Sequence, residues 1–213
     1  MIVTLLNRRL DRPLGRLLRP LCRWGLTPNL LSVAGLALNL AAAALLANGE
    51  FLKGGLLILV AGCFDFLDGI MARALGLQTP FGAFLDSVVD RYSDMALFTG
   101  LLLHYAAAGQ VGLVGLGAAA LVGAILTSYT RARAELLGIR CDRGLGRPER
   151  ILLLAAGALF DVMPAFLGIL AVLGHGTALW RIAITWVGAR RKMAAAGSPA
   201  AASLPRWVEE ARR

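Results

Sequence analysis

The sequence has little charge and few cysteines, and each shortage excludes a class of protein. Only 16% of its 213 residues are charged while 58% are hydrophobic, a composition too apolar for an ordinary soluble domain of this size. The three cysteines, Cys22, Cys63 and Cys141, form neither an even set nor a C-x-x-C pair, so neither a disulfide framework nor a thiolate metal site is indicated. The composition predicts an integral membrane protein.

Acidic residues are also scarce, at 13 against 22 Lys and Arg, for a formal net charge of +9. On an apolar chain, such an excess usually gathers on one side of a bilayer, so no nucleic-acid partner is expected. When the helices proposed below are drawn, every Lys and Arg except Lys53 falls on the side of the amino terminus. The chain is therefore expected to be a multi-pass protein of the cell (inner) membrane, with both termini in the cytoplasm.

The first 26 residues have the pattern of an amphipathic helix rather than of a cleaved signal peptide. Leucines recur at helical spacing while arginines occupy the other faces, as in helices that lie in the headgroup region. Residues 1–26 are therefore predicted to form an interfacial helix.

Apolar stretches and their breakers predict an all-α fold with six transmembrane helices in one domain, residues 27–193. Thr27-Pro28-Asn29 is a helix-start cluster, and a turn is expected at 48–50. The remainder, 194–213, is expected to be a cytoplasmic tail. The six predicted helices lie near 29–48, 52–73, 82–105, 111–131, 149–162 and 164–187.

Five aspartates interrupt this apolar sequence: Asp65, Asp68, Asp86, Asp90 and Asp94. An ionised side chain near the middle of a bilayer costs roughly 2.5–3.5 kcal/mol, so such a group needs a strong partner. The first two are three residues apart and the others four apart, which puts each set on one helix face. Counted from the outer helix ends, each set lies about 18–21 Å deep, so antiparallel neighbours would bring them to the same level.

Facing carboxylates without a nearby His or Cys favour a hard cation, Mg²⁺ or Mn²⁺, over zinc. Four of them are enough for two ions. A paired-metal site suits phosphoryl chemistry, because the ions can bridge a diphosphate and stabilise the leaving oxygen. The spacing thus predicts a diphosphate-handling enzyme whose active site lies at the cytoplasmic face.

The residues between the aspartates carry a specific resemblance. The order Asp65-x2-Asp68-Gly69-x2-Ala72-Arg73-x8-Gly82-x3-Asp86-x3-Asp90 matches every fixed position of the pattern of the CDP-alcohol phosphatidyltransferase family, which the chain resembles over nearly its whole length. The resemblance implies transfer of a phosphatidyl group from a CDP-linked lipid, such as CDP-diacylglycerol, to an acceptor hydroxyl, with release of CMP. It also implies a homodimer.

By this resemblance the motif residues divide into three roles. Asp65, Asp68, Asp86 and Asp90 are the implied metal ligands, and Asp90 is also the general base that takes the acceptor's proton. The implied CDP-lipid contacts are Asn29, Leu30, Leu31, Ser32, Gly69, Arg73, Thr79 and Gly82.

The stretch 128–135 and the basic loop ending at 147–150 resemble one branch of the family, the phosphatidylinositol phosphate synthases and the archaetidylinositol phosphate synthases of archaea. In that branch a basic pocket recruits the phosphate of inositol 1-phosphate, and the matching positions are Arg131, Arg150 and Arg181. The loop before Arg150 is one residue shorter than the branch pattern, so Arg147 receives no role.

Alternatives remain open at this stage. The preference of basic residues for the cytoplasmic side of a membrane would by itself explain the same arginines. The acceptor could also be glycerol 3-phosphate, serine or free inositol. A membrane transporter or a prenyltransferase can also hold intramembrane aspartates, but a transporter does not require this spacing of small residues and Arg73. A prenyltransferase is expected to have a second Asp-rich motif, and the sequence has none after Asp94.

Overall fold

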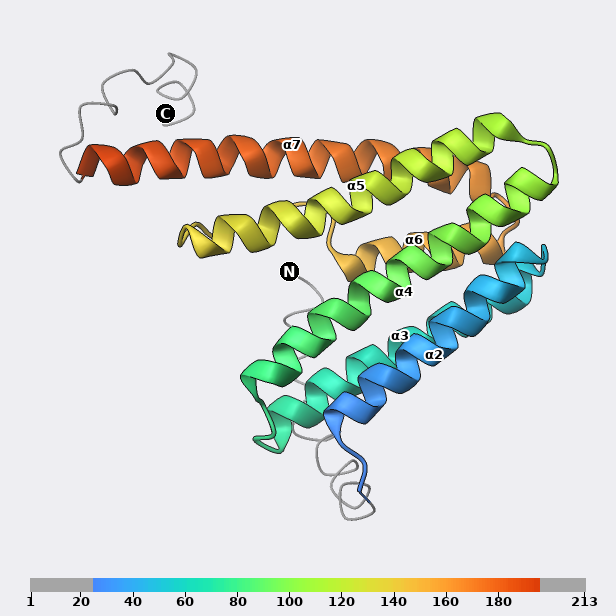
Figure 1. Ribbon diagram of the computed structural model, residues 1–213, viewed down its shortest axis with the longest axis horizontal. Coiled ribbons are helices and arrows are strands. Elements are labelled where there is room, and N and C mark those ends of the chain that lie inside the picture. The colour runs from blue at the N-terminus through green and yellow to red at the C-terminus, as the bar shows by residue number, and fades with distance from the viewer. Residues whose placement is uncertain (1–24, 196–213) are drawn as a thin grey trace.

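The computed structural model describes residues 25–195, which form helices without strands (Figure 1). The all-α prediction is confirmed for this range, and the helices follow the predicted order. The interfacial helix predicted at 1–26 falls almost wholly outside the described residues, as does the tail after residue 195. The described helices are α2 (Pro28–Ala47), α3 (Phe51–Ala74), α4 (Pro80–Ala107), α5 (Val111–Leu136), α6 (Arg147–Leu159) and α7 (Met163–Ala195).

Two threonines begin the helices that carry much of the motif. The Thr27 hydroxyl accepts a hydrogen bond from the backbone N–H of Leu30, and the Thr79 hydroxyl accepts one from Gly82. Each threonine is followed by a proline at the first helical position, where the missing N–H has no intrahelical partner to lose. The start of α2 is therefore the one that the sequence predicted.

The last three helices differ from their predicted bounds, and α5 ends at Leu136, five residues beyond its predicted end. Helix α6 begins two residues early, at Arg147, because the Glu149 side chain accepts the N–H of Gly146 and caps the first turn. Helix α7 continues to Ala195, eight residues beyond the predicted end. Its basic end contacts the end of α5, since Lys192 Nζ donates to the backbone carbonyl of Leu137 at 2.5 Å.

Four helices are long and apolar enough to cross a membrane: α2, α3, α5 and α7. Helix α4 is 28 residues long, but Asp86, Asp90 and Asp94 lower its hydropathy. Helix α6 has 13 residues, about 20 Å of helix, which is short for a bilayer core of about 30 Å. The fold is thus that of a helical membrane protein with four candidate spans among the described residues.

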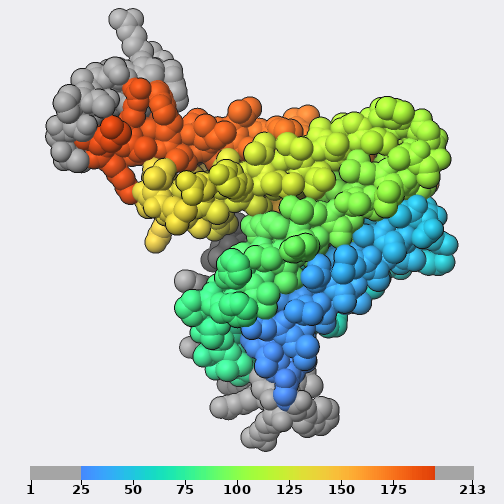
Figure 2. Space-filling model, viewed as in Figure 1, coloured from blue at the N-terminus to red at the C-terminus, as the bar shows by residue number. Residues whose placement is uncertain are grey.

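The helices form two groups that diverge at one end of the molecule (Figure 1). Helix α2 packs on α3 and α4, α5 packs on α7, and α6 contacts both α3 and α7. At the end where the α2–α3 and α4–α5 turns lie, the groups touch, whereas at the other end α4 and α5 separate around a hollow (Figure 2). The motif aspartates lie toward this open end.

Candidate active site

The structure brings the aspartates of two helices close together. Asp65 and Asp68 lie on α3, and Asp86, Asp90 and Asp94 lie on α4. One guanidinium, that of Arg147, reaches aspartates of both helices. Asp68 and Asp94 are buried, and the other three are partly exposed.

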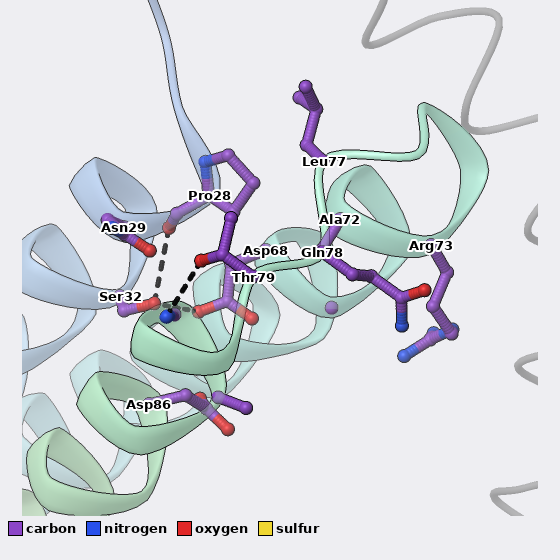
Figure 3. Close-up of a pocket in the computed structure, with 13 residues that line it drawn as sticks. Pro28, Asn29, Ser32, Asp68, Ala72, Arg73, Leu77, Gln78, Thr79 and Asp86 are labelled. Carbon is purple, nitrogen blue, oxygen red and sulfur yellow. Dashed lines mark hydrogen bonds between the residues drawn. The ribbon is translucent and has the colours of Figure 1, made fainter.

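Helix α2 supports the α3 aspartates from behind. Ser32 Oγ donates a 2.6 Å hydrogen bond to Asp68 Oδ2 (Figure 3). One turn on, Gly35 faces Asp65 so closely that a Cβ at position 35 would lie 2.7 Å from Asp65 Oδ1. Gly35 therefore leaves the space that the Asp65 carboxylate occupies. Its role is missed by sequence reasoning, because one glycine in an apolar helix carries no distinguishing signal.

Arg147, at the first position of α6, lies among the carboxylates. Its Nη1 is 2.6 Å from Asp65 Oδ2 and 2.7 Å from Asp90 Oδ1, and its Nε is 3.6 Å from Asp94 Oδ1. Its side chain is only 15% exposed. Arg147, which received no role in the sequence analysis, therefore connects α3, α4 and α6.

The carboxylates fit a hard divalent cation in kind, since they are the oxygen ligands that Mg²⁺ and Mn²⁺ prefer. Asp94 Oδ1 is buried and has no hydrogen-bond partner within the described range. As they stand, no three acidic, His or Cys side chains of residues 25–195 converge on one point closely enough to hold an ion. The space between Asp65 and Asp90 is taken by the Arg147 guanidinium.

A first cavity, of about 150 Å³, lies between the starts of α2 and α4 and the end of α3 (Figure 3). Asp68 and Arg73 on α3 and Asp86 on α4 line it. A Cβ at Gly82 would lie 3.0 Å from Thr79 Oγ1 and would narrow this cavity. Six of the eight expected CDP-lipid contacts line it: Asn29, Ser32, Gly69, Arg73, Thr79 and Gly82.

The other two expected contacts lie elsewhere. Leu30 is 52% exposed on the outer surface of α2. Leu31 is buried against Ile70 and Met71. The structure does not bring either leucine to the cavity, because successive helix residues point in different directions and only one face of α2 turns toward α3 and α4.

A second, larger cavity of about 580 Å³ lies between α4, α5 and the start of α6. Asp86 and Asp90 line it on the α4 side, and Asp86 also lines the first cavity. The three expected acceptor arginines, Arg131, Arg150 and Arg181, all line the second cavity, as does Arg147. The two cavities therefore meet at one carboxylate.

The three arginines differ in their surroundings. Arg131 is half exposed and pairs with Glu135 at 2.9 Å. Arg150 and Arg181 are buried, and both donate to Thr127 on α5, Arg150 to its hydroxyl at 3.0 Å and Arg181 to its carbonyl. Arg150 also lies 2.5 Å from Asp94, which makes it a tie between α6 and α4.

Comparisons with known proteins agree with this geometry. A model of the family described as CDP-alcohol phosphatidyltransferase matches residues 25–189. The chain is 41% identical over 144 residues to the phosphatidylinositol phosphate synthase of Mycobacteroides abscessus, covering 66% of each protein. It is 37% identical over 171 residues to the archaetidylinositol phosphate synthase of Methanothermobacter thermautotrophicus, covering 77% of this chain and 85% of the relative.

Crystal structures of the Mycobacterium tuberculosis phosphatidylinositol phosphate synthase share the fold, with a TM-score of 0.76 and 33% identity. The match covers 90% of this chain and 98% of the crystallised one in the structure with CDP-DAG bound, and 92% and 93% in the complex with manganese and citrate. The predicted resemblance is thus confirmed over most of the chain. The chain belongs to the CDP-alcohol phosphatidyltransferase family.

Proposed function

We propose that the protein transfers the phosphatidyl group of CDP-diacylglycerol to the hydroxyl of inositol 1-phosphate and releases CMP. The observation that carries this proposal is the meeting of two cavities at Asp86, one lined by the motif residues and the other by arginines. A donor on one side and an anionic acceptor on the other would meet where the carboxylates lie. Holding two reactants in this way favours group transfer by proximity.

The first cavity is the proposed CDP-lipid site. Small residues at Gly69 and Gly82 leave room for a nucleotide close to the helices, and Arg73, which also lines the cavity, supplies positive charge for a phosphate. Leu30 on the outer surface of α2 is suited to contact lipid tails rather than the nucleotide. The crystal structure of the mycobacterial relative with CDP-DAG supports the choice of donor.

Asp65, Asp68, Asp86 and Asp90 are the proposed ligands of two Mg²⁺ or Mn²⁺ ions. When bound, the metal would stabilise negative charge on the reacting diphosphate and on the leaving oxygen. Manganese in the relative's crystal structure supports this assignment. The Ser32 hydrogen bond to Asp68 and the close packing at Gly35 hold two of the proposed ligands in place.

Asp90 is the proposed general base. It lines the arginine-rich cavity, so its carboxylate can accept the proton of an acceptor hydroxyl that enters there. Its neighbour Asp86 lines both cavities and stands between donor and acceptor. The proton therefore leaves on the acceptor side while CMP leaves on the donor side.

Arg131, Arg150 and Arg181 are the proposed ligands of the acceptor's phosphate. Guanidinium groups bind phosphate oxygens by charge-assisted hydrogen bonds, which an unphosphorylated alcohol cannot make. The similarity to a phosphatidylinositol phosphate synthase and an archaetidylinositol phosphate synthase supports an inositol phosphate acceptor.

The proposed setting is a homodimer in the inner membrane, with residues 27–193 as the catalytic domain. In it all six described helices cross the bilayer, α4 and α6 shielded by their neighbours, and the active site and both termini face the cytoplasm. The gathering of the basic helix ends at the open end of the molecule supports this orientation (Figure 1).

Acceptor profiling tests the proposed reaction. Purified protein is supplied with CDP-diacylglycerol and Mn²⁺, and CMP release is compared for inositol 1-phosphate, free inositol, glycerol 3-phosphate and serine. Inositol 1-phosphate is expected to give the highest kcat/KM. A higher value with another alcohol would keep the family chemistry and overturn the proposed acceptor.

A further inference from the structure

The position of Arg147 has no part in the function proposed above. This arginine begins α6, yet its Nη1 contacts Asp65 on α3 and Asp90 on α4 at 2.6 and 2.7 Å. It is the cation nearest to both carboxylates among the described ion pairs. The positive charge that the aspartates need inside an apolar bundle is thus supplied by the chain itself.

The guanidinium is held there mainly by charge. Its Nη1 makes the hydrogen bond to Asp65, whereas its Nε and Nη2 are buried without a hydrogen-bond partner among residues 25–195. An arginine that settles permanently in a protein interior usually satisfies its fork of donors. Arg147 therefore occupies a position that it can leave without breaking a complete hydrogen-bond network.

A divalent ion and the Arg147 guanidinium cannot occupy this place together. Mg²⁺ binds carboxylate oxygens at about 2.1 Å, so an ion bridging Asp65 and Asp90 needs the space in which Nη1 lies. We propose that Arg147 is a built-in counter-ion of the acidic site, and that a divalent cation binds by displacing it. This inference rests on the proposed function only in taking Asp65 and Asp90 as metal ligands.

The displaced side chain has a destination. Arg147 also lines the second cavity, beside Arg131, Arg150 and Arg181. Moving into that cavity would add a fourth guanidinium where the acceptor's phosphate is proposed to bind. Metal binding would then favour phosphate binding, and by linkage phosphate would favour metal to the same extent.

The test measures Mn²⁺ binding to purified protein in detergent, without any substrate. The electron paramagnetic resonance signal reports the Mn²⁺ that remains unbound in the solution. Arg147→Gln removes the competing charge and is expected to lower the Kd for Mn²⁺ by about tenfold or more. The matched control is Arg143→Gln, which removes the same charge from an exposed position four residues earlier and is expected to stay within about threefold of the parent. An unchanged or higher Kd for Arg147→Gln would overturn the proposal.

A second measurement uses the unaltered chain, so it stands even if Arg147→Gln fails to fold. Phenylglyoxal modifies accessible arginines, and peptide mass spectrometry reports each site. Mn²⁺ is expected to raise modification of Arg147 several-fold while leaving Arg143 unchanged. Equal modification of Arg147 with and without Mn²⁺ would overturn the displacement.

These outcomes are separate from those of the proposed reaction. If Mn²⁺ displaces Arg147 but no acceptor supports CMP release, the counter-ion role stands and the proposed function fails. If CMP is released but Mn²⁺ binds equally well to the parent and to Arg147→Gln, the reaction stands and the counter-ion role fails.

Discussion

Arg150 Nη2 on α6 lies 2.5 Å from Asp94 Oδ2 on α4, and both side chains are at most 5% exposed. This buried pair joins the short α6 to a helix with which it shares the active site. Arg150, one of the three arginines proposed to bind the acceptor's phosphate, therefore also joins α6 to α4. The fifth aspartate, which lies outside the matched motif, has a structural partner.

The first prediction concerns this pair. Asp94→Ala leaves the Arg150 guanidinium buried without its carboxylate, and breaking a buried ion pair in this way typically costs about 3–5 kcal/mol. The free energy of unfolding, measured by SDS titration from mild detergent, is expected to fall by that amount. Glu135→Ala is the matched control, since it breaks an ion pair whose members are both half exposed and should cost about 0–1 kcal/mol. Equal losses would contradict a structural role for Asp94.

The second prediction concerns the close approach of α2 and α3. Gly35→Ala puts a Cβ 2.7 Å from Asp65 Oδ1, so the carboxylate has to move. The Kd for Mn²⁺ is expected to rise by about tenfold, because one ligand is misplaced. Gly115→Ala is the control, since no atom lies within 4 Å of its added Cβ. Parent-like Mn²⁺ binding by Gly35→Ala would contradict a role of Gly35 in positioning the Asp65 carboxylate.

The third prediction separates acceptor from donor. Arg131→Gln removes a charge from the second cavity and is expected to raise the KM for inositol 1-phosphate by about tenfold, with little change in the KM for CDP-diacylglycerol. Arg73→Gln, in the first cavity, should do the opposite.

Arg133→Gln is the charge-matched control for the acceptor side, because Arg133 is exposed on the same helix and does not line the cavity. Added salt should weaken inositol 1-phosphate binding in the parent. If Arg131→Gln and Arg133→Gln have the same KM values as the parent, Arg131 does not bind the acceptor and serves only to orient the protein in the membrane.

The fourth prediction is topological. Single cysteines at positions 50 and 142, in a chain whose native cysteines are replaced, should react with a membrane-impermeant thiol reagent from opposite sides of the membrane. Position 142 should be cytoplasmic, because it lies in the arginine-rich loop. Labelling of both positions from the same side would contradict six membrane crossings.

Local sequence signals predicted much of the fold. Thr27 and Thr79 stand before prolines at helix starts, and their capping depends on residues within one turn. The aspartate spacing likewise placed each carboxylate set on one face of its helix. The predicted end of α7 was wrong, because falling hydropathy marks where a membrane ends, whereas a helix can continue into water.

The interior of the site was less predictable, because it depends on contacts between distant segments. Arg147 lies 82 positions from Asp65, and no spacing rule connects a loop arginine to a carboxylate on another helix. Asp94 extends the four-residue spacing of the motif, but its partner Arg150 is 56 positions away. Both pairs follow from how α6 packs between the two helix groups.

The most direct test of the central claim identifies the lipid made from CDP-diacylglycerol and inositol 1-phosphate by mass spectrometry. The parent protein with Mn²⁺ is expected to form phosphatidylinositol phosphate, and EDTA should abolish the product until Mn²⁺ is restored. Asp90→Asn should retain its fold but lose about 100-fold or more of the turnover, because the proposed base is gone. Absence of this lipid with the parent protein, or parent-like turnover by Asp90→Asn, would contradict the account.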